Sequence, residues 1–156
     1  MARTAITAEG YENLKAEHKR LSEVDRRKIS QEIGVARDHG DLSENAEYHA
    51  AKEKQGQIEA RIRQLEAILS NAEIIDPARL GGERVKFGAR VTLEDIESGK
   101  MSEYRLVGTE EADIDKGTIS IASPLARALI NHQVGDEVRV RAPGGERTYE
   151  IAEIRW

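Results

Sequence analysis

The stretch RDHGDLSENAEYH (residues 37–49) separates two long helical patterns and therefore decides the fold. Before it, apolar residues recur mostly at intervals of three, four or sums of these from Ala8 to about Asp38, in a charge-rich run without proline. After it, a second run of this kind extends from about Leu42 to Ala72. Gly40 interrupts the pattern between the two runs. These features predict two helices joined by a tight turn.

Each predicted helix has one apolar stripe and polar faces elsewhere, which is typical of an antiparallel coiled coil. Thr7 is a good candidate for the N-cap of the first helix. A helix of about 30 residues is about 45 Å long, so the turn lies far from the rest of the chain. The expected stripe residues are Tyr11, Leu14, Leu21, Val24, Ile29, Ile33 and Ala36 in the first helix, and Tyr48, Ala51, Ile58, Ile62, Leu65, Leu69 and Ala72 in the second.

The remaining sequence predicts a second unit of a different class. Helical periodicity ends near Asp76-Pro77, and Ser123-Pro124 opens a short helix, because Ser favours the N-cap and Pro the first helical position. We predict an α+β protein with a coiled coil over residues 1–76 and an antiparallel sheet with one helix over residues 80–156. The expected strands are Val85–Leu93, Ser102–Val107, Thr118–Ile121, Glu137–Arg141 and Arg147–Ile154.

Composition excludes several classes of function. The chain has 24 basic and 29 acidic residues, a net charge of −5, which argues against tight independent binding to DNA or RNA. It has no cysteine, which excludes disulfides and thiolate metal sites. The sequence shows neither a secretory signal nor an apolar run long enough to span a membrane, so we expect a cytoplasmic protein without a membrane partner.

Asp41 and Glu44, within the turn, allow two explanations. Asp at an N-cap with Glu three residues later forms a capping box, a common way to begin a helix. Alternatively, the two carboxylates point outward and share a divalent cation such as Mg²⁺, whose other ligands come from a partner. The residues alone leave both explanations open.

Basic and histidine residues flank the turn. Arg37 and Lys52 are candidates for a small patch that guides a single RNA strand, although pairing with neighbouring carboxylates is an alternative. His39 and His49 are too few for a zinc site in a chain without cysteine. Tyr48 lies on the apolar stripe, where we expect it to pack across the hairpin.

Motifs spread over the whole chain match one known family. The most specific is ARDHGDLSENAEYHAAK at residues 36–52, and others follow at residues 69–72 (LSNA), 87–89 (FGA), 121–126 (IASPLA) and 143–146 (PGGE). On these residues the chain resembles the bacterial GreA/GreB transcript cleavage factors. The resemblance implies an N-terminal antiparallel coiled coil followed by a C-terminal domain of FKBP-like fold.

The resemblance also implies a mechanism. The coiled coil would enter the secondary channel of RNA polymerase while the C-terminal domain docks near the rim of that channel. Asp41 and Glu44 match the family's acidic pair, which helps the polymerase to hold a second Mg²⁺ when it hydrolyses backtracked nascent RNA. The chain would be an auxiliary factor and not an independent nuclease, would hold no Mg²⁺ stably alone, and is expected to be monomeric.

Other site residues follow from the same resemblance. Arg37 and Lys52 fall where the family has a basic patch facing the 3′ segment of the RNA. Ser43 and Asn45 are expected to supply secondary polar contacts at the tip. Ser123-Pro124 matches a family element on the docking domain and is expected to contact the polymerase.

Three alternatives remain to be compared with this interpretation. A Gre-like inhibitor would occupy the channel without stimulating cleavage, but the intact acidic pair argues against it. A GreB-type factor would carry a larger basic patch, whereas residues 1–76 hold 12 basic and 15 acidic side chains, which favours the GreA type. A coiled-coil adaptor or isomerase-like chaperone is less favoured, because residues 80–156 contain only four aromatic residues to line a pocket.

Overall fold

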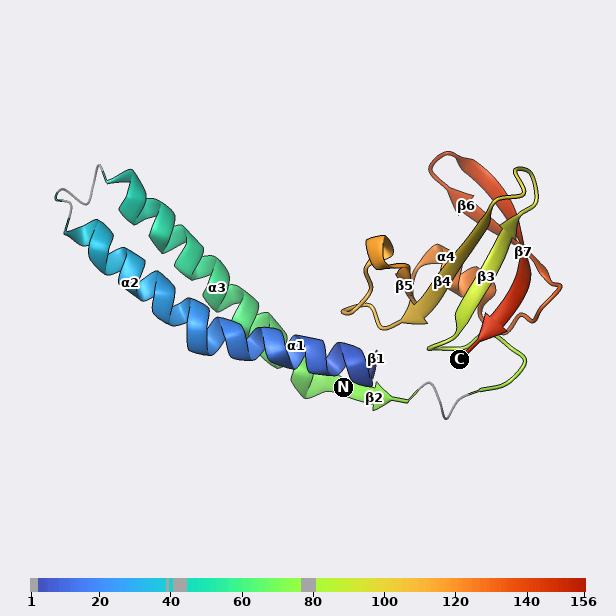
Figure 1. Cartoon of the computed structure of the whole chain (residues 1–156), viewed down its shortest axis with the longest axis horizontal. Coiled ribbons are helices and arrows are strands. Elements are labelled where there is room, and N and C mark those ends of the chain that lie inside the picture. Colours follow the sequence, from blue (N-terminus) through green and yellow to red (C-terminus); the bar gives the residue numbers. More distant parts are fainter. Residues whose placement is uncertain (1–2, 39, 41–44, 77–80) are drawn as a thin grey trace. The chain divides into compact units, whose positions relative to one another are not determined.

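The computed structural model describes residues 3–38, 40, 45–76 and 81–156 (Figure 1). Contacts divide the chain into two compact units, one of Tyr11–Ala72 and one of Met1–Gly10 with Glu73–Trp156. The first is helical and the second contains a mixed sheet, which confirms the predicted α+β class. Residues 77–80 lie outside the described part, so the predicted domain limits, 1–76 and 80–156, stay a prediction.

The helical unit is a hairpin. Its first arm runs through α1 (Ala8–Arg20), a π-helical segment (Leu21–Asp25) and α2 (Arg26–Arg37). Its second arm is α3 (Ala46–Asn71), which lies beside the first arm in Figure 1. The predicted hairpin is thus confirmed, although α3 begins at Ala46 and not near Leu42.

A single apolar seam joins the two arms. The predicted stripes form it in large part, and Tyr11, Tyr48, Leu69 and Ala72 are half-buried at its margins. Val24 is an exception, since it is 43% exposed, and its predicted place on the stripe is wrong. The buried seam residues are Leu14, Leu21, Ile29, Ile33 and Ala36 from the first arm, and Ala51, Ile58, Ile62 and Leu65 from α3.

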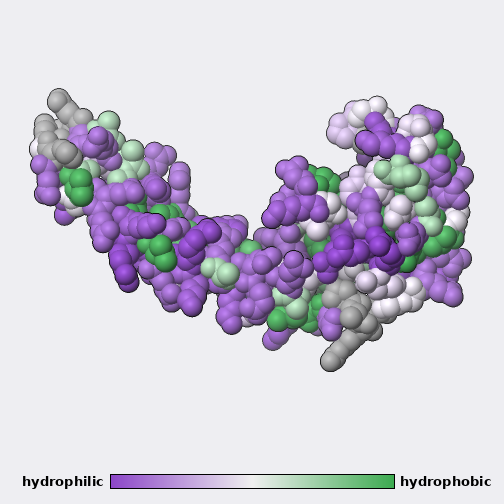
Figure 2. Space-filling view, in the orientation of Figure 1, coloured by the Kyte–Doolittle hydropathy of each residue, from purple (hydrophilic) through white to green (hydrophobic). Residues whose placement is uncertain are grey.

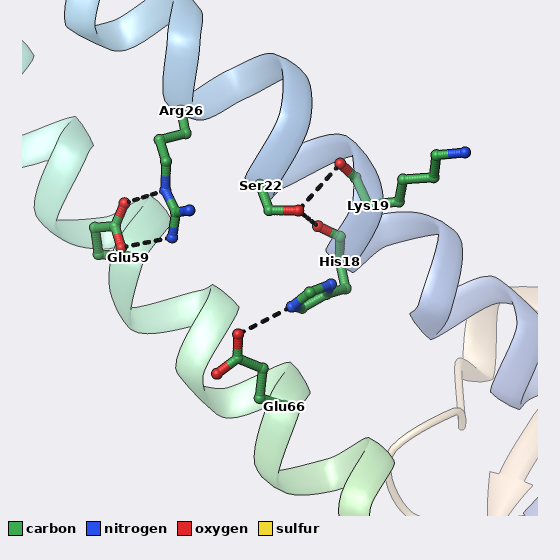
Figure 3. A network of polar contacts seen from close by, with 6 residues as sticks. All are labelled: His18, Lys19, Ser22, Arg26, Glu59 and Glu66. Atoms are coloured by element: carbon green, nitrogen blue, oxygen red, sulfur yellow. Dashed lines mark hydrogen bonds and ion pairs between the residues drawn. The ribbon is translucent and has the colours of Figure 1, made fainter.

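The π-helical segment explains the position of Val24. Leu21 and Ile29 are eight residues apart, one more than the seven that would keep both on one face of a regular helix. A π-turn bonds residue i to i+5 and so takes up one additional residue, which keeps Ile29 in the seam and turns Val24 outward. The hydroxyl of Ser22 donates a hydrogen bond of 2.8 Å to the carbonyl oxygen of His18, as Figure 3 shows. The predicted uninterrupted α-helix is therefore wrong at this segment.

Ion pairs on both sides of the seam set the relative position of the two arms. Arg26 binds both carboxylate oxygens of Glu59, at 2.7 and 3.0 Å (Figure 3). Arg61 binds both oxygens of Glu17, also at 2.7 and 3.0 Å. The hydrogen bond from each guanidinium lowers the pKa of its carboxylate partner. Bidentate geometry makes these pairs more specific than ordinary surface ion pairs.

Two short strands were not predicted from the sequence. They are β1 (Thr4–Thr7) and β2 (Ala72–Ile75), which pair in a sheet of their own. The Thr7 hydroxyl accepts a 3.0 Å hydrogen bond from the amide of Gly10, which confirms Thr7 as the cap of α1. The Glu111 carboxylate accepts hydrogen bonds from the amide of Thr7, at 2.8 Å, and from its hydroxyl. Strand β1 is thereby tied to the C-terminal part of the chain.

The larger sheet has five strands in the order β5-β4-β3-β7-β6. All neighbours are antiparallel except β4 and β5, so the prediction of a purely antiparallel sheet is wrong. The chain between these two strands passes through a 3₁₀ turn at Ile114–Lys116, and this connection brings β5 back in the direction of β4. The strands are β3 (Arg90–Asp95), β4 (Met101–Val107), β5 (Thr118–Ser120), β6 (Glu137–Ala142) and β7 (Gly145–Arg155).

The helix α4 (Pro124–Leu129) covers one face of this sheet (Figure 1). Ser123 is its N-cap, with the hydroxyl accepting a 3.2 Å hydrogen bond from the amide of Ala126, as the sequence predicted. Alternate residues of the strands point toward α4 and are buried, which is the period expected for a half-buried strand. The core comprises Val85, Ala89, Val91, Leu93, Leu106, Ile119, Ala126, Leu129, Val138 and Ile151.

Candidate functional site

The candidate site is the connection between α2 and α3. Helix α2 ends at Arg37, and Gly40 follows with a φ of 114°, a conformation that favours glycine. This agrees with the predicted break at Gly40. The predicted site residues Asp41, Ser43 and Glu44, as well as His39, lie outside the described residues.

Asn45 connects the two helices on the far side of the turn. It is the N-cap of α3, where its Oδ1 accepts a 3.1 Å hydrogen bond from the amide of Tyr48. Its Nδ2 donates a 2.5 Å hydrogen bond to the carbonyl oxygen of Ala36 in the last turn of α2. Helix α3 begins after Asn45 and not near Leu42. The capping-box explanation concerns Asp41 and Glu44, which lie outside the described residues, and stays a prediction.

The two basic candidates lie on different arms next to the turn. Arg37 is exposed at the end of α2, and Lys52 is exposed in the second turn of α3. The ammonium of Lys52 donates a 3.2 Å hydrogen bond to the amide oxygen of Gln55. The alternative in which these cations pair with neighbouring carboxylates finds no support in the described residues, where no ion pair involves either Arg37 or Lys52.

An open groove lies between the last turns of α2 and the first turns of α3. Val35, which is 60% exposed, and the small side chains of Ala36, Ala50 and Ala51 form its apolar part. Charged residues of both arms border it, namely Lys28, Glu32, Glu47 and Lys54. Tyr48 is half-buried nearby, with its ring edge-to-face against that of His49 at a centroid distance of 5.6 Å.

The docking candidates Ser123 and Pro124 lie in the other unit. The cap hydrogen bond holds Ser123 in a half-buried position, while Pro124 is exposed at the first position of α4. The local geometry therefore explains both residues as a helix start. Whether Pro124 contacts a partner stays a prediction.

Three arginines on this unit were not foreseen. Arg90 on β3 lies directly opposite Arg105 on β4 and Arg155 on β7. Arg155 binds Glu103 at 2.7 Å and Arg105 lies 3.5 Å from Glu9, whereas Arg90 has no ion pair or hydrogen bond of its side chain within the described residues. Figure 2 shows strongly hydrophilic side chains gathered in a band across the C-terminal unit. Like charges directly opposite each other destabilise a sheet.

Comparison with known proteins places these features in a family. Residues 4–74 match the family described as "Transcription elongation factor, N-terminal", and residues 80–155 match "Transcription elongation factor, GreA/GreB, C-term". The chain belongs to the GreA/GreB transcription elongation factor family. The GreA/GreB resemblance noted in the sequence is thereby confirmed, and it covers both units.

Curated relatives of GreA/GreB type are similar over their full length. The transcription elongation factor GreA of Alkalilimnicola ehrlichii is 53% identical over 157 residues, which cover 100% of this chain and 99% of that protein. The GreA of Anaeromyxobacter sp. (strain K) is 56% identical over 154 residues, covering 99% and 93%. Among solved structures, GreA factor homolog 1 (Gfh1) of Thermus thermophilus is 33% identical, covers 99% of both chains and has a TM-score of 0.44.

Two features of this GreA/GreB chain could not be read from its sequence in full. Asn preceding a helical run is a good N-cap signal, and it could have identified Asn45 as the start of α3. The second hydrogen bond of Asn45, to α2, has no signal in the sequence. The arginine row depends on cross-strand register, which composition and periodicity do not show.

None of the described helices combines the length and the apolar character needed to cross a membrane.

Proposed function

We propose that the helical hairpin enters the secondary channel of RNA polymerase and that its tip stimulates the polymerase's own cleavage of backtracked nascent RNA, which rescues arrested complexes. One observation carries this proposal: a GreA/GreB family chain has the acidic pair Asp41 and Glu44 in the short connection between α2 and α3. The C-terminal unit would dock near the rim of the channel, with Ser123 and Pro124 at the contact.

The donor atoms of the acidic pair fit a shared Mg²⁺. This ion takes oxygen ligands and is typically held by one or two carboxylates together with water and phosphate oxygens. Two carboxylates are too few to hold it alone, and the described residues contain no group of three His, Cys, Asp or Glu side chains suited to a metal. The polymerase would therefore supply the remaining ligands. When bound, Mg²⁺ activates a water molecule and stabilises negative charge on the phosphodiester.

The chain's own residues have separate tasks in this proposal. Asp41 and Glu44 bind the ion and orient the attacking water by accepting its hydrogen bonds. Arg37 and Lys52 attract the phosphates of the RNA 3′ segment, and their exposure next to the turn supports this role. Each cation contributes little in open solution, but exclusion of water inside a channel would strengthen its interaction with phosphate.

The protein would therefore act only as an auxiliary factor. An exposed pair of carboxylates does not assemble a two-metal site, so we expect no nuclease activity without the polymerase. A monomer suffices, because one hairpin occupies one channel. Action on a transcribing polymerase places the protein in the bacterial cytoplasm.

The test is a cleavage assay on a backtracked polymerase complex with 5′-labelled RNA and Mg²⁺. Wild-type protein should release short 3′ fragments, and the double variant Asp41→Ala/Glu44→Ala should bind the polymerase without doing so. The matched control is Asp38→Ala/Glu53→Ala, which removes the same charge from exposed positions beside the tip and should retain activity.

Two results would contradict the proposal. Wild-type protein that binds without stimulating cleavage would be a channel-blocking inhibitor. If the two double variants lost activity equally, net charge and not the acidic pair would be responsible.

A further inference from the structure

Asn45 makes two hydrogen bonds that serve different purposes. Its Oδ1 accepts from the amide of Tyr48, at 3.1 Å, and so caps α3. Its Nδ2 donates to the carbonyl oxygen of Ala36, at 2.5 Å, and so reaches the last turn of α2. One short side chain thus binds the end of one arm and the start of the other.

Capping alone does not require the second bond. Ser, Thr and Asp cap helices about as well as Asn, because capping uses only an acceptor oxygen. Asn is the only common N-cap residue whose side chain also carries an amide N–H donor. Here that donor binds the carbonyl oxygen of Ala36. This acceptor is a carbonyl group of the last turn of α2, which also receives the backbone N–H of Asp38.

The second bond also joins the two ends of the connection between α2 and α3. Residues 36 and 45 bound the segment that contains both carboxylates, so the bond between them fixes the two ends of that segment relative to each other. Fixing the ends of a short segment removes many of its conformations. Glu44 is the residue directly before Asn45, so the backbone of Asn45 sets the direction in which the chain leaves α3 toward Glu44.

We propose that Asn45 is a positioning residue for the acidic pair, acting through its bond to Ala36 and not through contact with RNA. This inference rests on the proposed function. It differs from the polar contact that the family resemblance suggested, because both ends of the amide are already bound within the hairpin. Misplacement of a catalytic group by about 1 Å can reduce a rate by about 100-fold, so the placement of the acidic pair has a direct consequence for cleavage.

Asn45→Asp separates the two bonds. It keeps the acceptor that caps α3, loses the amide donor and places a carboxylate against the carbonyl of Ala36. Asn45→Ser is the neutral counterpart, because it caps but is too short to bridge to α2. Ala46→Asp is the charge control, since it adds the same charge one residue away, in the first helical turn where Asp is tolerated.

The first measurement is the cleavage rate of the backtracked complex as a function of factor and of Mg²⁺ concentration. For Asn45→Asp and Asn45→Ser we expect a maximal rate lower by about tenfold to 100-fold, a higher Mg²⁺ concentration for half-maximal rate, and a half-saturating factor concentration within about twofold of wild type. Ala46→Asp should behave as wild type. Normal cleavage by both Asn45 variants, or a loss explained by weaker polymerase binding, would overturn the proposal.

A second measurement does not depend on cleavage. Backbone amide order parameters from NMR on the free protein should fall at Gly40 in both Asn45 variants and stay unchanged in Ala46→Asp. Unchanged values in the Asn45 variants would overturn the positioning role. If wild-type protein fails to stimulate cleavage while the order parameters change as expected, the proposed function fails and the bond between the arms stands.

Discussion

Because the π-helical segment in the first arm accommodates one additional residue, we predict that the hairpin tolerates the deletion of one residue there. Deleting Val24 from this segment changes the spacing of Leu21 and Ile29 from eight residues to seven. A regular α-helix then keeps both residues in the seam, and the π-turn is no longer needed. The deleted side chain is 43% exposed, so little packing is lost. We expect the hairpin to remain folded.

Deleting Arg63 from α3 is the matched control, because α3 contains no π-turn to absorb the change. Each residue of an α-helix turns it by about 100°, so Leu65 would turn away from the seam while Ile62 stays in it. Leu65 is fully buried, and exposing such a side chain costs about 1.5–3 kcal/mol. For a unit of this size that cost lowers the melting temperature by roughly 6–24 °C.

The assay is thermal and urea unfolding followed by circular dichroism at about 222 nm, where the helical hairpin dominates the signal. The Val24 deletion should change the free energy of unfolding by less than about 1 kcal/mol, because neither seam contact is lost. The Arg63 deletion should show the larger loss. Equal losses in both variants would refute the argument that the π-turn accommodates an additional residue in the seam.

Three further predictions concern stability and use the same unfolding assay. The guanidinium of Arg61 lowers the pKa of Glu17, so this pair stabilises the folded state above the unfolded pKa of about 4.3. The free energy of unfolding of wild type should therefore exceed that of Glu17→Gln at neutral pH, and the difference should vanish as the pH falls through the lower folded pKa. A difference that grows on acidification would contradict this. Arg90→Glu places an acid between two arginines and should raise the free energy of unfolding by about 0.2–1 kcal/mol, whereas a loss would show that the row is not repulsive. Ser123→Ala removes the cap of α4 and should cost about 1 kcal/mol, an effect that Ser123→Asp should largely avoid.

Local patterns predicted the helical parts of the fold well. The two arms follow from apolar spacing, and the starts of α1 and α4 follow from Thr7 and Ser123 as caps. The π-turn was not predicted, because Val24 was placed on the stripe although its interval of five to Ile29 does not fit a regular helix. The exposure of Val24 in the structure shows that a regular α-helix would not keep both Leu21 and Ile29 in the seam.

Long-range pairing was predicted less well. Strands β1 and β2 have four residues each and lack an alternating pattern long enough to detect. The parallel pairing of β4 with β5 depends on the path of the chain between them, which local propensity does not contain. The same limit hid the arginine row around Arg90, because its members are far apart in sequence.

At the candidate site, the sequence predicted which residues are important, and the structure shows their positions and hydrogen bonds. The family resemblance named Arg37, Lys52 and Asn45, and the structure places all three beside the turn. It also shows that Asn45 bonds within the hairpin, a geometry that residue identity alone does not predict. The roles of Asp41 and Glu44 stay a proposal.

The central claim is that the tip carboxylates help RNA polymerase to hold a catalytic Mg²⁺. Its most direct test is the Mg²⁺ dependence of transcript cleavage in one backtracked complex, measured without factor, with wild-type protein and with Asp41→Asn/Glu44→Gln, each at saturating concentration. We predict that wild-type protein lowers the Mg²⁺ concentration for half-maximal cleavage by about tenfold, as a charged ligand worth about 1.4 kcal/mol would, and that the variant leaves it at the value without factor. An equal shift by both proteins would contradict the claim.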